Sequence, residues 1–196
     1  MKVAIFASGS GSNAEAIVRY LHHEHPEKGI RVACIIANKP YAYVLERAKM
    51  LDIPARYMTP SELRDEEQLL PLLADFGVEY IILAGYLALI PPFLLKTFPQ
   101  RIVNIHPALL PKHGGKGMYG MHVHEAVKAA GETETGITIH IIDEEYDKGT
   151  TLFQARTAVV SSDTPEEIAQ KVHLLEHRYF PEVISRWILG EPQTLD

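Results

Sequence analysis

The sequence predicts an α/β fold in which a mostly parallel, twisted sheet carries helices on both faces. Two observations lead to this prediction. Short apolar runs alternate along the chain with longer segments of helical spacing, which is the pattern of βαβ units. The first three apolar runs are almost continuously hydrophobic, as strands buried on both faces are. Because such sheets bind ligands at the carboxyl ends of their strands, candidate residues are sought there.

Six runs have the length and composition of β-strands. The last of them alternates between apolar and polar residues more than the others, which favours an antiparallel strand nearer an edge of the sheet. The expected strands are Val3–Ala7, Val32–Ala37, Tyr80–Ala84, Ile102–Ile105, Ile137–Ile142 and Leu152–Val160.

Five segments have helical spacing. The last has the clearest start, because Asp163-Thr164-Pro165-Glu166-Glu167 offers a cap, a proline for the first turn and acidic residues that face the positive end of the helix dipole. The expected helices are Asn13–His25, Tyr41–Leu51, Ser61–Phe76, Val123–Ala130 and Pro165–Leu189.

Composition excludes several classes of protein. The 196 residues are 46% hydrophobic and 22% charged, which is typical of a globular chain with a core of its own. A net charge of -6 argues against a nucleic-acid partner, which would require a basic face. The single cysteine, Cys34, cannot form an internal disulfide, so a cytoplasmic location is expected. The longest uncharged stretch, Tyr80 to Leu95, is too short to span a membrane, so no membrane partner is expected.

The loop after the first strand is built of small residues, Ser8-Gly9-Ser10-Gly11-Ser12-Asn13-Ala14, and it opens a helix. Backbone N–H groups at a helix start favour an anion such as phosphate. The loop also fits the dinucleotide pattern G-x-G-x-x-A, but Asn38-Lys39-Pro40 after the second strand supplies no carboxylate for a ribose. A smaller phosphate ester is therefore favoured over NAD, and a glycine-rich turn without a ligand is the alternative.

Asn104-Ile105-His106-Pro107 closes the fourth expected strand. The two-residue period of a strand places the side chains of Asn104 and His106 on the same side of the backbone. An amide donor beside an imidazole suits a developing oxyanion and a proton transfer, which acyl transfer requires. A histidine with a purely structural hydrogen bond is the alternative.

A third candidate combines His140, on the fifth expected strand, with the acidic loop that ends at Asp147-Lys148-Gly149. A carboxylate on this loop could orient and charge a neighbouring histidine, and a solvated acidic turn is the alternative. His113, His122 and His124 form a further group, but no cysteine partner or HExxH spacing accompanies them, so no metal site is expected.

Together these motifs resemble the phosphoribosylglycinamide formyltransferase family over about Lys2 to Trp187. The resemblance rests on seven features in the expected order. They are Gly11-Ser12-Asn13, Asn38-Lys39 through Leu45-Glu46-Arg47-Ala48, Leu83-Ala84-Gly85-Tyr86, Asn104-Ile105-His106-Pro107, Leu109-Leu110-Pro111-Lys112, His140 with Asp147, and Glu176-His177.

The resemblance implies a Rossmann-like formyltransferase fold in one domain, residues 1–196. About residues 1–100 would form a half that binds the ribonucleotide phosphate, and about 101–196 a catalytic and folate-binding half. It implies transfer of a formyl group from 10-formyltetrahydrofolate, as co-substrate, to the amine of 5-phosphoribosylglycinamide in de novo purine biosynthesis. Small-molecule substrates would be the partners of a monomer or weak homodimer, with no metal.

The resemblance also implies roles for individual residues. Asn104, His106 and Asp147 match the catalytic residues; Gly11, Ser12 and Asn13 match the phosphate loop, and Glu176 matches a residue that recognises the glycinamide end. Glu176 is expected at the margin of an apolar stripe of Val172, Leu175, Tyr179 and Val183. Folate would contact Arg64, Leu87, Ala88, Leu89, Ile90, Asn104 and His140. Ala88 stands where several family members carry an arginine.

Other functions remain open at this point. A sugar-nucleotide formyltransferase would share Asn104, His106 and Asp147. Methionyl-tRNA formyltransferase would need a further RNA-binding domain, and formyltetrahydrofolate deformylase usually carries an N-terminal regulatory domain. From other classes, a non-catalytic nucleotide-binding module or an NAD-linked oxidoreductase would also use the glycine-rich loop.

Overall fold

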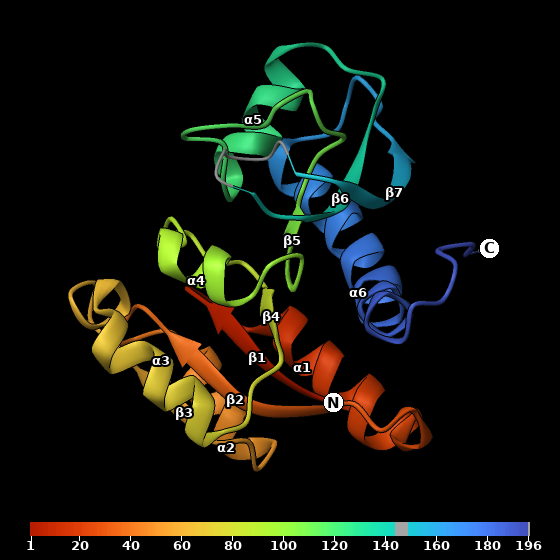
Figure 1. Ribbon diagram of the computed structural model, residues 1–196. Helices are drawn as coiled ribbons and strands as arrows, with labels where there is room; N and C mark the ends of the chain where they lie inside the picture. The colour runs from red at the N-terminus through yellow and green to blue at the C-terminus, as the bar shows by residue number, and fades with distance from the viewer. Residues whose placement is uncertain (144–148, 196) are drawn as a thin grey trace. The chain divides into compact units, whose positions relative to one another are not determined.

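The computed structural model describes residues 1–143 and 149–195 (Figure 1). Its strands are β1 (Lys2–Ala7), β2 (Arg31–Ala37), β3 (Ala55–Tyr57), β4 (Tyr80–Leu83), β5 (Ile102–His106), β6 (Glu134–Ile141) and β7 (Thr151–Ala158). They form a seven-stranded sheet in the order β3-β2-β1-β4-β5-β6-β7. The predicted Asp147 lies outside the described residues.

Strand pairing confirms the predicted sheet. β1 runs parallel to both β2 and β4, and β2 runs parallel to β3. β7 pairs with β6 in the antiparallel direction and stands at the edge of the sheet, as the alternating pattern of its sequence predicts. Val3–Ala7 of β1 is 0% exposed throughout. Since successive side chains of a strand point to opposite faces, the sheet is covered on both faces at β1.

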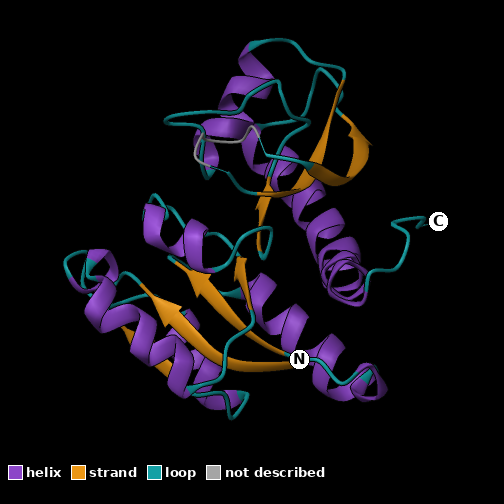
Figure 2. Ribbon diagram, viewed as in Figure 1, coloured by secondary structure: helices purple, strands orange, loops and turns teal. Residues whose placement is uncertain are grey.

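The α-helices are α1 (Ser12–Arg19), α2 (Val44–Met50), α3 (Glu66–Asp75), α4 (Pro92–Thr97), α5 (Met121–Ala129) and α6 (Pro165–Leu189) (Figure 2). A π-helix covers Tyr20–Glu24, and 3₁₀-helices cover Pro26–Lys28 and Glu62–Arg64. α6 begins with the predicted cap. The Thr164 hydroxyl accepts from the Glu167 N–H, and the Glu167 carboxylate accepts from the Thr164 N–H, at 3.2 and 2.8 Å.

Several element boundaries differ from the predicted ones. The helix expected at Ser61–Phe76 is interrupted at Asp65, whose extended backbone starts α3 and whose carboxylate accepts from the Glu67 N–H at 3.0 Å. The helix expected at Asn13–His25 widens to a π-helix at Tyr20, where the His22 Nε2 accepts the N–H of Val32 at 2.8 Å. Neither β3 nor α4 was predicted, because each is too short to show a periodic pattern.

The chain forms two compact units, Met1–Val103 and Asn104–Asp196. The core of the first unit surrounds β1 and β2 and includes Cys34, which is 2% exposed; burial raises the pKa of its thiol to about 12. The core of the second unit packs α6 against α5, β6 and β7. None of the helices in the described part of the chain is long and apolar enough to cross a membrane.

Candidate functional site

The loop between β1 and α1 requires glycine at position 11. Gly11 has a φ of +77°, and a Cβ placed there would lie 2.8 Å from the Cα of Val44. The first helical hydrogen bond runs from the N–H of Glu15 to the Gly11 carbonyl at 2.9 Å. The N–H groups of Ser12 and Asn13 therefore precede the helical ladder, which is the geometry of an anion site.

Helix α2 fixes the conformation of this loop. The Val44 N–H donates to the Gly9 carbonyl at 3.1 Å, and the Arg47 Nε donates to the Ser10 carbonyl at 2.8 Å. Arg47 also pairs with Glu15 on α1. Hydrogen bonds and charge from Arg19 and Arg47 hold the pKa of Glu15 below its usual value, so this carboxylate stays ionised. Contacts with α2 thus hold the loop in one conformation.

A cavity of about 480 Å³ lies in the Met1–Val103 unit. Four of the predicted folate-binding residues line it, namely Arg64, Ala88, Leu89 and Ile90. The remaining lining residues are mostly apolar: Asn38, Pro60, Leu63, Tyr86, Pro91, Pro92 and Phe93. Arg64 therefore places a cation in a largely apolar wall, which suits an aromatic ligand with a carboxylate.

Leu87, also predicted to bind folate, is not among the lining residues of this cavity. Its N–H donates to the Ser8 hydroxyl at 2.8 Å, and its side chain is 45% exposed. Tyr86 beside it is buried against Phe6, with ring centroids 5.5 Å apart, and burial raises the pKa of its phenol to about 12. Tyr86 is therefore a neutral wall of the cavity.

Asn104 and His140 are in contact in the second unit. The Asn104 Nδ2 lies 3.1 Å from the His140 Nε2, and His140 is 1% exposed. An amide nitrogen can only donate, so the His140 Nε2 is the acceptor in this contact. This contact uses one of the two Nδ2 hydrogens of Asn104, and it fixes which way the amide points.

His106 at the end of β5 is 3% exposed, and its Nε2 lies 2.8 Å from the carbonyl oxygen of His113. A carbonyl can only accept, so Nε2 carries a proton. The proton that this imidazole gains or loses on titration is consequently the one on Nδ1. Both predicted strand-end residues thus have one polar atom held by a neighbouring group.

Thr138 on β6 holds the turn that follows His106. Its hydroxyl donates to the Ala108 carbonyl at 2.7 Å and accepts from the Leu110 N–H at 2.9 Å. The Gln154 Nε2, on β7, reaches both this hydroxyl and the Leu110 carbonyl, at 2.9 and 3.0 Å. Neither Thr138 nor Gln154 was predicted as a site residue, because polar residues are common in strands.

The predicted position of Glu176 on α6 is wrong. Glu176 is 6% exposed and lies in the middle of the buried face, not at its margin. The buried face advances in steps of four residues through Ile168, Val172, Glu176, Phe180 and Ile184. The expected stripe members Leu175 and Tyr179 are only half-buried. A carboxylate inside an apolar face is costly to bury unless it is paired and hydrogen-bonded.

Two histidines contact or face Glu176. The His173 Nδ1 lies 2.8 Å from its carboxylate, and this hydrogen bond raises the pKa of His173. His124 on α5 is 6% exposed, and burial lowers its pKa, while the charge of Glu176 acts in the opposite direction. No group of three or more metal-ligating side chains occurs among residues 1–143 and 149–195.

Comparison with known proteins identifies the family. Residues 1–184 match the sequence model of the family described as formyl transferase. The chain belongs to the formyl transferase family. It is 39% identical to phosphoribosylglycinamide formyltransferase of Bacillus subtilis over 193 residues, which cover 96% of this chain and 95% of that protein. The resemblance and the α/β fold class expected from the sequence are thereby confirmed.

This formyl transferase family member is also 41% identical to the chloroplastic phosphoribosylglycinamide formyltransferase of Arabidopsis thaliana. That match covers 94% of the chain but only 64% of the plant protein. Among solved structures, the phosphoribosylglycinamide formyltransferase of Bacillus halodurans has a TM-score of 0.85 at 36% identity, covering 96% of this chain and 95% of that one. Glycinamide ribonucleotide transformylase 1 of Symbiobacterium toebii has a TM-score of 0.87 at 31% identity, covering 97% and 88%.

Proposed function

We propose that this protein transfers a formyl group from 10-formyltetrahydrofolate to the amine of 5-phosphoribosylglycinamide. The observation that carries the proposal is the pair at the end of β5, in which Asn104 is held by His140 and His106 by the His113 carbonyl. Relatives named phosphoribosylglycinamide formyltransferase, aligned over nearly the whole chain, support the choice of substrate.

The reaction requires a nucleophilic amine, a stabilised oxyanion and one proton transfer. The neutral amine attacks the formyl carbon, a C–N bond forms, and the carbonyl oxygen becomes an oxyanion. The second Nδ2 hydrogen of Asn104 and the Nδ1–H of protonated His106 stabilise this charge. Collapse breaks the bond between the formyl carbon and the folate nitrogen, and the proton lost by the amine ends on that nitrogen.

Asp147 completes the proposed catalytic group. A carboxylate near His106 favours the imidazolium, so Asp147 would support the charge that His106 carries during the reaction. This role rests on the match of Asp147 to the family motif.

The acceptor requires an anion site and a polar site for its glycinamide end. The N–H groups of Gly11, Ser12 and Asn13 at the start of α1 suit the 5′-phosphate. Glu176, buried and already bonded to His173, suits the glycinamide end because a buried carboxylate gains from a donor brought by the ligand.

The folate would use the cavity of the first unit. Its apolar wall suits an aromatic ring system, and Arg64 suits a carboxylate of the folate tail. Ala88, Leu89 and Ile90 would contact the folate through the backbone and apolar atoms, and Leu87, Asn104 and His140 are proposed as further contacts. A cytoplasmic location and a monomeric or weakly dimeric state stay predictions.

The direct test is product analysis by mass spectrometry. The protein is incubated with 10-formyltetrahydrofolate and, in separate reactions, glycinamide ribonucleotide, an amino-sugar nucleotide, or no acceptor. We expect the ribonucleotide alone to gain the mass of one carbonyl group, with equimolar tetrahydrofolate. Formylation of the amino-sugar nucleotide alone, hydrolysis without an acceptor, or no reaction would each contradict the proposal.

A further inference from the structure

The contact between His106 and His113 depends on an unusual backbone conformation. His113 has a φ of +53°, in the left-handed region that residues other than glycine seldom adopt. Its carbonyl reaches the His106 Nε2 only as long as this turn keeps its shape. Two glycines that follow, Gly115 and Gly117, also have positive φ values and lie outside helices and strands.

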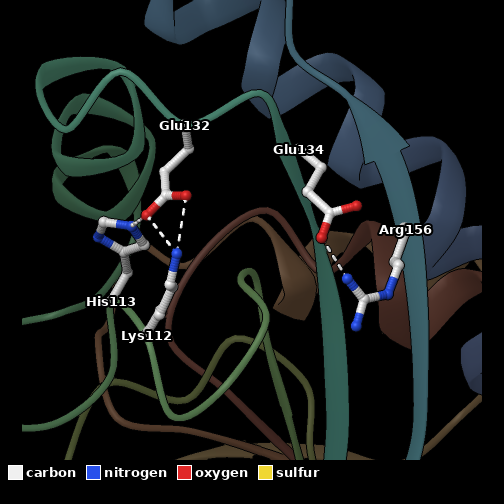
Figure 3. A network of polar contacts seen from close by, with 5 residues as sticks. All are labelled: Lys112, His113, Glu132, Glu134 and Arg156. Atoms are coloured by element: carbon white, nitrogen blue, oxygen red, sulfur yellow. Dashed lines mark hydrogen bonds and ion pairs between the residues drawn. The ribbon is translucent and has the colours of Figure 1, made fainter.

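Glu132 contacts the side chains of two residues of this turn, Lys112 and His113 (Figure 3). Its carboxylate lies 3.2 Å from the His113 Nε2 and 3.0 Å from the Lys112 Nζ. The side chains of Glu132 and His113 are 21% and 16% exposed, whereas that of Lys112 is 67% exposed. Hydrogen bonds from Lys112 and His113 lower the pKa of Glu132, so it is ionised at neutral pH.

The backbone of Glu132 is itself anchored. Its N–H donates to the carbonyl of Val127, in the last turns of α5, at 3.3 Å. Strand β6 begins two residues after Glu132. A chain of contacts therefore runs from the end of α5 through Glu132 and the His113 ring to the His113 carbonyl and the His106 imidazole. The ion pair of Glu132 with Lys112, whose side chain is 67% exposed, contributes little to stability. The contact of Glu132 with the largely buried His113 ring is the one that acts on the turn.

We propose that Glu132 is a positioning residue for His106, which it orients by holding His113 in the left-handed turn that directs the His113 carbonyl at Nε2. The inference rests on the proposed function in one respect, namely that His106 takes part in catalysis. The orientation itself is independent of the reaction. Fixing Nε2–H leaves Nδ1 as the titrating nitrogen of His106, and a displaced carbonyl would allow the other tautomer.

The experiment compares Glu132→Gln with Glu134→Gln. Glu134 lies two residues further along and pairs with Arg156 on β7, where the two side chains are 49% and 59% exposed (Figure 3). The control thus removes the same charge from the same stretch of chain without touching His113. The tautomer of His106 is read by NMR of ¹⁵N-histidine protein at mildly alkaline pH, with the His106 signals assigned by their loss in His106→Gln.

We expect neutral His106 to carry its proton on Nε2 in the wild type and in Glu134→Gln, and to populate the Nδ1–H tautomer in Glu132→Gln. With the kinetics of formyl transfer, kcat of Glu132→Gln should fall about tenfold while KM changes less than about twofold. If Glu132→Gln does not fold, His113→Phe removes the same hydrogen bond from the other partner and should shift the tautomer in the same way.

An unchanged His106 tautomer in the folded variant overturns the inference. A wild type that transfers no formyl group contradicts the proposed function, while the NMR comparison still decides whether Glu132 orients His106. A wild-type tautomer together with a lower melting temperature in Glu132→Gln would show a merely structural ion pair, and this too overturns the inference.

Discussion

Single residues determine the shape of the glycine-rich loop between β1 and α1, and Gly11 is one of them. Its positive φ and the close approach of Val44 leave no space for a side chain. Gly9, two residues earlier, has nothing within 4 Å of the position a Cβ would take. The two glycines therefore make a matched pair for testing whether the loop binds the ribonucleotide.

We expect Gly11→Ala to weaken ribonucleotide binding by roughly ten- to a hundredfold, because displacing the loop loses charge-assisted hydrogen bonds to the phosphate. Gly9→Ala should bind as the wild type does. Folate affinity should stay unchanged in both, since other residues are proposed to contact the folate. Isothermal titration calorimetry with each ligand measures this. Equal ribonucleotide affinity in the two variants would contradict the proposal that this loop binds the phosphate.

The buried side chain of His124 makes the stability of the protein depend on pH. Burial lowers its pKa in the folded protein, so the unfolded chain binds a proton more readily. The loss of unfolding free energy caused by His124 is absent above the ordinary histidine pKa of 6.5, and it grows as pH falls below that value. Glu176 acts against this shift, and His173 and His106 reinforce it.

We therefore expect the free energy of unfolding to decline from neutral to mildly acidic pH less steeply in His124→Asn than in the wild type. His122→Asn is the control, since His122 stands on the same helix with a side chain that is 64% exposed. Urea unfolding at a series of pH values measures the slopes. A wild-type slope in His124→Asn would mean that this histidine stays solvated.

At the scale of elements, the start of α6 tests whether local sequence signals contribute to the stability of the second unit. Thr164 and Glu167 form a reciprocal capping box ahead of the longest helix. Thr164→Ala should lower the free energy of unfolding by about 1 kcal/mol, because an orphan N–H loses its acceptor. Ser162→Ala, at an exposed residue of the preceding turn, should change it by less than half as much. Chemical denaturation would show equal losses if the cap contributes nothing.

The elements also show what a sequence can predict. The period of two placed Asn104 and His106 together on one strand, and the start of α6 was readable from the segment Asp163 to Glu167. Glu176 was misplaced because Leu175 and Tyr179 suggested a stripe shifted by one residue from the buried one. Apolar residues lie on both of these possible stripes of α6. Only the packing of α6 against α5 and the strands determines which stripe is buried.

Contacts between distant residues were not predictable in this way. Thr138 is 30 residues from Ala108, and Glu132 is 19 from His113, with no periodic pattern to join them. Such contacts depend on where the turns after β5 and α5 come to lie. The strands and helices were therefore largely predictable, while the groups that orient Asn104 and His106 were not.

At the scale of the whole molecule, the central proposal is that Asn104 and His106 perform formyl transfer. The most direct measurement is kcat and the two substrate dissociation constants for Asn104→Ala and His106→Ala, with His122→Ala as a control at an exposed histidine. Each site variant should lose on the order of 10² or more in kcat. The dissociation constants should change little, because these interactions strengthen mainly in the transition state. Near wild-type kcat in either variant would contradict a catalytic role of that residue.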